Sequence, residues 1–187
     1  QEYERLDHLV YEGPSEPAIT GGLNNMFRYK NWRLNVFITY SFGNKLRLDP
    51  VFAASYSDLA AMPKEFKNRW VMPGDEKSTD IPAIASVRQN YNDRYLSYAY
   101  NAYNYSTARV ADGGFVRLKD ISLTYDFNPQ LISKIGLGSA SLKLDATNLV
   151  LLYADKKLNG QDPEFVNSGG VATPLSKQFT FTVRLGI

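Results

Sequence analysis

The sequence predicts an all-β protein whose antiparallel strands form part of a transmembrane β-barrel. Three observations support this fold class: apolar and polar residues alternate along several segments, these segments are long, and the connections between them alternate between short and long. Successive side chains of a strand point to opposite faces, so alternation indicates a sheet with two different faces. Strands that cross a bilayer need about 9 to 11 residues, whereas strands of soluble domains have about 5 to 6.

The clearest predicted strand covers 32–42, where apolar and aromatic residues occupy every even position. The alternation over 22–29 predicts a preceding strand, and the tight connection at 30–31 joins the two strands as a hairpin. Tyr29 and Trp32 flank this connection, which is where an aromatic girdle would lie at a membrane interface.

Three more strands are predicted downstream. The first covers 115–127 and changes phase midway, which predicts a bulge near Lys119 or Asp120. The second covers 139–153, where an alternating part is followed by an apolar run. The third is a regularly alternating strand over 179–187.

The connections differ in length in a regular way. Those at 30–31 and 128–138 are short, and 130–135 reads as one turn of helix or a compact loop. Those at 45–112 and 154–177 are long and show little sign of helix. Outer-membrane barrels have short periplasmic turns and long extracellular loops, so we expect the short connections in the periplasm and the long ones outside the cell.

Composition argues against several other classes. The longest apolar run, 149–154, is far shorter than the about 20 residues that a membrane-spanning helix needs. The net charge is +2 with both signs spread along the chain, so nucleic acid is not predicted as a partner. The chain has no cysteine, which excludes disulfides, thiol catalysis and cysteine-bound metals within it.

Residues suited to catalysis or metal binding are few. His8 is the only histidine, so this chain cannot form a Ser-His-Asp triad or a multi-histidine metal site, and we expect His8 to be a solvated loop residue. Asp162 and Glu164 are spaced for a hard cation such as calcium, although a turn held by aspartate and proline is the favoured interpretation. We predict that the chain is not an enzyme and has no catalytic residue, metal or cofactor.

A soluble β-sheet protein is the main alternative, because a β-sandwich also alternates along its strands. The tyrosine-rich segment would suit a soluble carbohydrate-binding module. The membrane barrel is favoured because the predicted apolar faces of 32–42 and 179–187 carry no charge, whereas a charge facing lipid at the bilayer centre costs about 2 to 4 kcal/mol.

Six groups of motifs occur in the order found in the SusC/RagA family of TonB-dependent transporters, which the chain resembles over nearly its whole length. They are Pro17, GGLN at 21–24, YK at 29–30 and FG at 42–43; RW at 69–70, PGD at 73–75 and IP at 81–82; GGFVRLKDISLTY at 113–125; NL at 148–149; DPE at 162–164; and Pro174.

This resemblance implies a barrel of about 22 strands closed around a plug. Residues 1–187 would be the C-terminal portion of that barrel, without the plug and the TonB-contacting segment that the family carries at its N-terminal end. The implied function is import of oligosaccharides or peptides across the outer membrane of Bacteroidetes-type bacteria. The implied partners are a SusD-like surface lipoprotein, TonB through the missing N-terminal part, and outer-membrane lipid.

Six tyrosines crowd into 91–105 and are the candidate binding residues of the chain. Their spacing, with Asn and Asp between them, favours a surface loop that packs on itself over a regular strand. Two interpretations remain open: the rings hold the loop together, or they contact the imported substrate or the lipoprotein lid. The candidates are Tyr91, Tyr95, Tyr98, Tyr100, Tyr103 and Tyr105.

Overall fold

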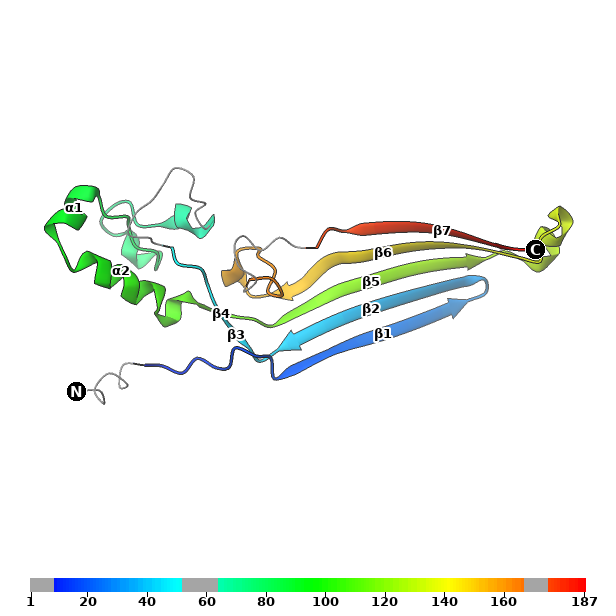
Figure 1. The fold of residues 1–187 in the computed structure, drawn as a ribbon, viewed down its shortest axis with the longest axis horizontal. Coiled ribbons are helices and arrows are strands. Elements are labelled where there is room, and N and C mark those ends of the chain that lie inside the picture. Colours follow the sequence, from blue (N-terminus) through cyan, green and yellow to red (C-terminus); the bar gives the residue numbers. More distant parts are fainter. Residues whose placement is uncertain (1–8, 52–63, 167–174) are drawn as a thin grey trace.

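The computed structural model describes residues 9–51, 64–166 and 175–187. Its main element is a single antiparallel sheet of five strands in the order β1-β2-β5-β6-β7 (Figure 1). The strands are β1 (Ile19–Tyr29), β2 (Trp32–Phe42), β5 (Phe115–Asp126), β6 (Ser139–Ala154) and β7 (Gln178–Gly186). A small second sheet pairs β3 (Lys45–Arg47) with β4 (Val110–Asp112).

Helices in the described residues are short and lie in the connections. They are α1 (Val87–Asn92), α2 (Leu96–Asn104) and α3 (Pro129–Ile132), with 3-10 turns η2 (Lys64–Asn68), η3 (Asp75–Lys77), η4 (Thr107–Arg109), η5 (Ser133–Ile135) and η6 (Lys156–Leu158). Within the part of the chain that the structure describes, no helix has the length and apolar character needed to cross a membrane.

The predicted strands are present, and the 32–42 strand has the predicted bounds. The first strand begins at Ile19, whereas the predicted strand began at Gly22, because Gly21 has no side chain that would extend the alternation. Aromatic rings of β2 occupy the space beside both glycines. A Cβ atom at Gly21 would lie 2.5 Å from the Tyr40 hydroxyl, and one at Gly22 would lie 2.8 Å from the Phe37 ring.

The predicted bulge in β5 is confirmed. Pairing with β2 jumps from Asp120 to Leu118 and leaves Lys119 without a partner in the register. The facing strand β6 is also irregular, since its pairing with β5 passes over 148–149. Asn148 adopts a left-handed backbone with φ of 54°, a conformation that asparagine tolerates better than most residues. The NL motif therefore marks a second bulge.

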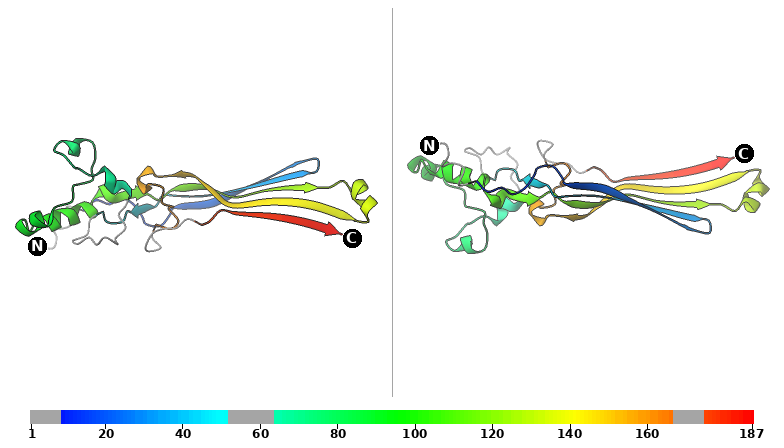
Figure 2. Two further views of the ribbon diagram at one scale, coloured as in Figure 1. Left: turned by 90° about the horizontal axis from the view of Figure 1, so that it is seen from above. Right: turned by 90° about the horizontal axis from the view of Figure 1, so that it is seen from below.

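The two ends of the sheet differ. The connection at 30–31 and the α3–η5 connection lie at one end, together with the C-terminus, while the longer connections lie at the other (Figure 1). The strands twist along their length, and the sheet remains one layer thick in the perpendicular views (Figure 2). The long connection at 45–112 is more ordered than the sequence predicted, because it contains β3, β4, α1 and α2.

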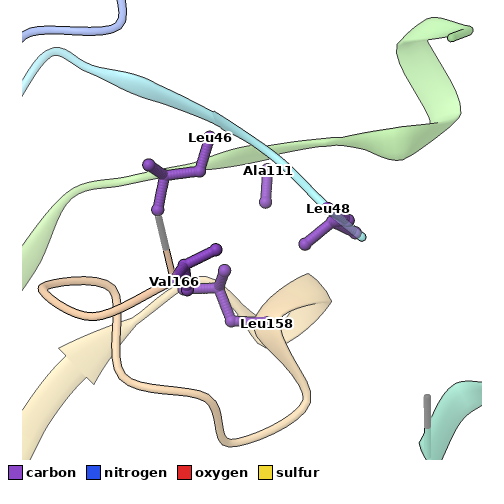
Figure 3. Close-up of a cluster of buried hydrophobic side chains, with 5 residues drawn as sticks. All are labelled: Leu46, Leu48, Ala111, Leu158 and Val166. Carbon is purple, nitrogen blue, oxygen red and sulfur yellow. The ribbon is translucent and has the colours of Figure 1, made fainter. Parts of the chain in front are cut away.

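The buried apolar cluster lies among the long connections rather than beneath the sheet. It joins residues of β3, β4 and the segment that follows β6 (Figure 3). Its members are Leu46, Leu48, Ala111, Leu158 and Val166. The connections at this end consequently have a small hydrophobic core of their own.

Candidate functional site

One face of the five-stranded sheet is almost entirely apolar, and its side chains are exposed. The strand registers place Leu23 of β1, Ile38 of β2 and Leu118 of β5 in one row across the sheet. Further along, Leu123, Leu144 and Phe181 form another row on the same face. Phe181 is 60% exposed and Leu144 is 51% exposed, although both lie within strands. Exposed apolar surface of this extent indicates contact with another apolar phase.

No paired position on this face carries a charge. A soluble β-sandwich would cover such a face with a second sheet, and the described residues provide no covering layer. The hydrocarbon of a lipid bilayer can also cover such a face, because exposure of apolar side chains to hydrocarbon has no free-energy cost, whereas exposure of charges does.

Aromatic residues cluster at both ends of the apolar face. At the short-turn end, the ring centroids of Trp32 and Tyr125 are 4.6 Å apart, and those of Tyr125 and Phe127 are 5.1 Å apart. At the other end, the Phe42 and Tyr153 centroids are 6.3 Å apart. Trp32 and Phe42 are ten steps apart on one strand, or roughly 33 Å. With a strand tilt of about 40°, this distance spans roughly 25 Å across a bilayer, as two interfacial girdles require.

The opposite face is polar and carries all the charges at paired positions of the sheet. Arg33 bonds Asp126 with an Nη2 to Oδ1 distance of 2.7 Å, and Lys143 lies 2.9 Å from Asp145. The other charged members of this face are Arg28, Arg117, Asp120 and Arg184. A wet barrel interior, or a polar domain seated in it, suits such a surface.

The tyrosine-rich segment lies beyond the sheet, on α1, α2 and the turn after α2 (Figure 1). It forms two short helices instead of the irregular loop that the sequence predicted. Ser86 accepts a hydrogen bond from the Gln89 backbone N–H, and the Gln89 side chain accepts one from the Ser86 N–H. This capping box starts α1, and the spacing of serine and glutamine is a signal that the sequence analysis missed.

The six tyrosines divide into two groups. Four are exposed, with exposed fractions from 68% to 86%: Tyr91, Tyr95, Tyr98 and Tyr105. The other two point toward the loop interior. Tyr100 donates a hydrogen bond to the Ala83 carbonyl at 2.9 Å, and the Tyr103 ring lies under the Arg109 guanidinium, 5.9 Å away. Burial raises the pKa of the Tyr103 phenol, despite the opposing effect of Arg109.

Comparisons with known proteins agree with this arrangement. No family model matches the chain. Two curated proteins of Formosa agariphila do: TonB-dependent receptor P39 is 31% identical over 170 residues, and TonB-dependent receptor P3 is 30% identical over 163 residues. The matches cover 89% and 87% of this chain but only 15% and 14% of those receptors.

Solved structures of the RagAB peptide importer share the fold. The 'open-open' state has a TM-score of 0.64 at 25% identity and covers 95% of this chain. A structure titled as the RagAB peptide transporter has a TM-score of 0.63 at 26% identity and covers 94% of it. In each case the match covers 18% of the importer chain.

The chain belongs to the SusC/RagA family of TonB-dependent receptors. Its cellular location is the outer membrane. The open antiparallel sheet has the fold of part of the RagA barrel.

Two SusC/RagA motifs that are distant in the sequence meet in the structure. The guanidinium of Arg117, in the RLK motif, pairs with Asp162 of the DPE motif and lies 3.0 Å from Glu164. Arg117 and Asp162 are both buried, so the pair ties the 154–177 connection to strand β5. The two carboxylates therefore both contact one guanidinium. Asp162 also stabilises the turn, because it accepts a hydrogen bond from the Glu164 N–H at 3.1 Å.

The RW, PGD and IP motifs build one compact loop. The Trp70 indole donates to the Thr79 carbonyl at 2.6 Å, and the Trp70 N–H donates to the Ile81 carbonyl at 3.0 Å. Asp75 Oδ2 accepts the backbone N–H groups of Val71 at 2.9 Å and Met72 at 2.8 Å. These two hydrogen bonds lower the pKa of Asp75.

Some predicted residues lie outside the description, and some important residues were missed. His8 and Pro174 fall outside the described residues. Sequence reasoning did not single out Glu65, Arg109 or Asn159, which form a hydrogen-bonded network between the two long connections. Single charged residues in polar segments carry no signal of pairing over such sequence separations.

Proposed function

We propose that this chain forms part of the wall of an outer-membrane importer of oligosaccharides or peptides. The observation that supports the proposal is the sheet itself, which has one charge-free apolar face, one charged face, and strands long enough to span a bilayer. The RagAB structures that it resembles are titled as a peptide importer. A barrel wall provides a passage and no bond-breaking chemistry, so we propose no enzymatic role and no cofactor.

Residues 1–187 are proposed to be the C-terminal portion of a barrel of about 22 strands. The chain spans about 15% of the length of its curated relatives, which leaves most of the protein to supply the other strands, a plug and a TonB-contacting segment. The long connections would then be extracellular and the short turns periplasmic. The RagAB complex has two named components, which supports a SusD-like lipoprotein as the partner at the extracellular face.

We further propose that the six candidate tyrosines have two roles. Tyr91, Tyr95, Tyr98 and Tyr105 form the tyrosine surface, an exposed set of rings available to substrate or to the lipoprotein. Tyrosine suits this role because it combines a large apolar area with a hydrogen-bonding tip and has few rotatable bonds. Tyr100 and Tyr103 hold the segment in place, through the contacts to Ala83 and Arg109.

The test is made on the exposed group in the full-length transporter. A Tyr95→Ala, Tyr98→Ala double variant should reduce uptake or co-purification of the lipoprotein about tenfold or more, as removal of contact residues does, with normal amounts of barrel. The matched control is Val87→Ala, which truncates an exposed side chain of α1 outside the tyrosine set and should leave uptake and lipoprotein binding normal. Normal uptake and normal lipoprotein binding by the double variant would reject the tyrosine surface.

The proposed orientation has its own test. Protease added to intact cells should cut within 45–112 or 154–177 and leave the short connection at 30–31 intact. Cleavage confined to the short connections would reverse the orientation.

A further inference from the structure

A buried carboxylate joins segments that are far apart in the sequence. Glu65 Oε1 accepts a hydrogen bond from Arg109 Nη1 at 2.5 Å, and Glu65 Oε2 accepts one from Asn159 Nδ2 at 2.9 Å. Glu65 and Arg109 belong to the connection between β2 and β5, whereas Asn159 belongs to the connection between β6 and β7. The two oxygens of one side chain thus bridge two separate connections.

The ion pair is largely shielded from water, whereas Asn159 lies at the exposed edge of the network. The side chain of Arg109 is 3% exposed and that of Glu65 is 14% exposed. Arg109 also donates from Nη2 to the Asp49 carbonyl at 2.5 Å, so its guanidinium contacts two segments at once. A buried ion pair with additional hydrogen bonds fixes geometry strongly, because loss of one partner leaves the other charge buried and unpaired.

The same network holds the tyrosine-bearing helix α2. Arg109 lies shortly after α2 and stacks on Tyr103 of that helix, 5.9 Å from the ring centroid. Asn104, the last residue of α2, accepts the Val51 N–H on its side-chain oxygen at 3.2 Å. Arg47 completes the attachment by donating to the Asn104 carbonyl at 3.4 Å. The C-terminal end of α2 is therefore bound to the segment after β2 and, through Arg109 and Glu65, to the segment after β6.

We propose that Glu65 is a positioning residue that clasps the two long connections together and thereby fixes the orientation of α2 relative to the sheet. The clasp consists of Glu65, Arg109 and Asn159. Its consequence for binding rests on the proposed function of the tyrosine surface: a partner would meet Tyr95 and Tyr98 already in place. Without the clasp, α2 samples several orientations, and the apparent affinity falls by the fraction of time spent in the competent one.

Spin labels can measure the clasp directly in the full-length transporter. Ala102 on α2 and Lys156 on η6 are both exposed, so Ala102→Cys and Lys156→Cys, made after any cysteine outside this chain has been replaced, provide a label on each side of the clasp. The pulsed electron–electron distance distribution should be narrow in otherwise unchanged protein. In Glu65→Ala its width should increase about twofold, as expected when a local tertiary attachment opens. Asn159→Gly tolerates the left-handed backbone at this position, with φ of 52°, removes only one of the two bridges and should broaden the distribution less.

The control is Glu76→Gln, which alters an exposed carboxylate that bonds the Gly74 N–H within its own loop. It should leave the distances unchanged. Unchanged distances in both Glu65→Ala and Asn159→Gly, with a folded barrel, would overturn the clasp. If Glu65→Ala lowers the amount of barrel, Asn159→Gly decides the question.

Affinity for the lipoprotein, measured on the same samples, separates this inference from the proposed function. Glu65→Ala should weaken it about tenfold if α2 is competent for only about a tenth of the time. Broader distances with unchanged affinity would support the clasp and count against the tyrosine surface as the contact.

Discussion

The sheet and the long connections of this chain are stabilised in opposite ways. The sheet exposes its apolar side chains and keeps its ion pairs on the polar face, with Arg33 and Asp126 both partly exposed. The connections bury a small apolar cluster and most of the Arg109–Glu65 ion pair, and Asp162 of one connection is buried against Arg117 of β5. An exposed apolar face would be unfavourable in the water around the connections, and a charged surface would be unfavourable against lipid.

The difference shows how the surroundings decide which side chains stabilise a region. In lipid, apolar contact is available from the solvent, so the sheet needs hydrogen-bonded strands and a charge-free face but no core. In water, the connections gain stability by removing Leu46, Leu158 and their neighbours from solvent. The change from a lipid-exposed apolar surface to a buried apolar cluster therefore occurs within a few residues of Phe42 and Ala154, where strands of the sheet meet the long connections.

The largest effect is expected from a charge on the apolar face of the sheet. Phe181→Asp replaces an apolar ring by a carboxylate in the row that contains Leu144, and a charge that faces hydrocarbon there is unfavourable. We expect the barrel to fail to assemble, measured as loss of the heat-modifiable band after detergent extraction.

The adjacent residue gives the matched control. Thr182 lies on the polar face opposite Lys143, so Thr182→Asp adds an attractive charge pair and should assemble normally. Equal assembly of the two variants would show that the faces are wrongly assigned.

A smaller, local effect is expected in the buried cluster. Leu158 is 1% exposed, and Leu158→Ala leaves a cavity among Leu46, Leu48 and Ala111 that should cost about 3 kcal/mol. Because the cluster does not support the sheet, we expect faster proteolysis of the long connections and an unchanged heat-modifiable band. Leu152→Ala on β6 is the control, since Leu152 is 55% exposed and leaves no cavity. Loss of the barrel in Leu158→Ala would make the connections part of the barrel's folding unit.

The smallest expected effect depends on pH. The pKa of Asp75 is lowered by the N–H groups of Met72 and Val71, so its stabilising contribution is complete above the ordinary value of 3.8 and disappears as the pH falls through the lower value in the folded loop. Amide exchange of Val71 and Met72, corrected for intrinsic rates, should therefore accelerate on acidification below about pH 4. Asp75→Asn should lack this step, and an identical pH profile in both proteins would contradict the assignment.

The sheet was predictable from the sequence because its pattern is local. Alternation gave the bounds of β2, and a change of phase located the bulge at Lys119. The early start of β1 was missed because Gly21, just before the predicted start, has no side chain to show which face of the sheet it occupies. The pair β3–β4 was missed because strands of three residues are too short to show alternation.

The candidate site was predictable only in part. Crowding of tyrosines pointed to α1 and α2, but not to the difference between exposed Tyr98 and inward Tyr103. That division depends on helical phase and on Arg109, whose partner Glu65 lies 44 residues away. Contacts formed by folding of irregular segments leave no periodic trace in the sequence, whereas strands do.

The alternation of short and long connections also has a consequence for the order of assembly. Strands β1 and β2 are joined at 30–31, and Asn31 already bonds the backbone of Asp126 through its side chain at 2.7 Å. Each hairpin, β1–β2 and β5–β6, closes a short loop, whereas joining β2 to β5 closes one several times longer, and each doubling of loop length adds about 0.6 kcal/mol of entropic cost. The hairpins are thus the natural units that enter the membrane. Asn31 then provides a docking point at which the second hairpin finds its register beside the first.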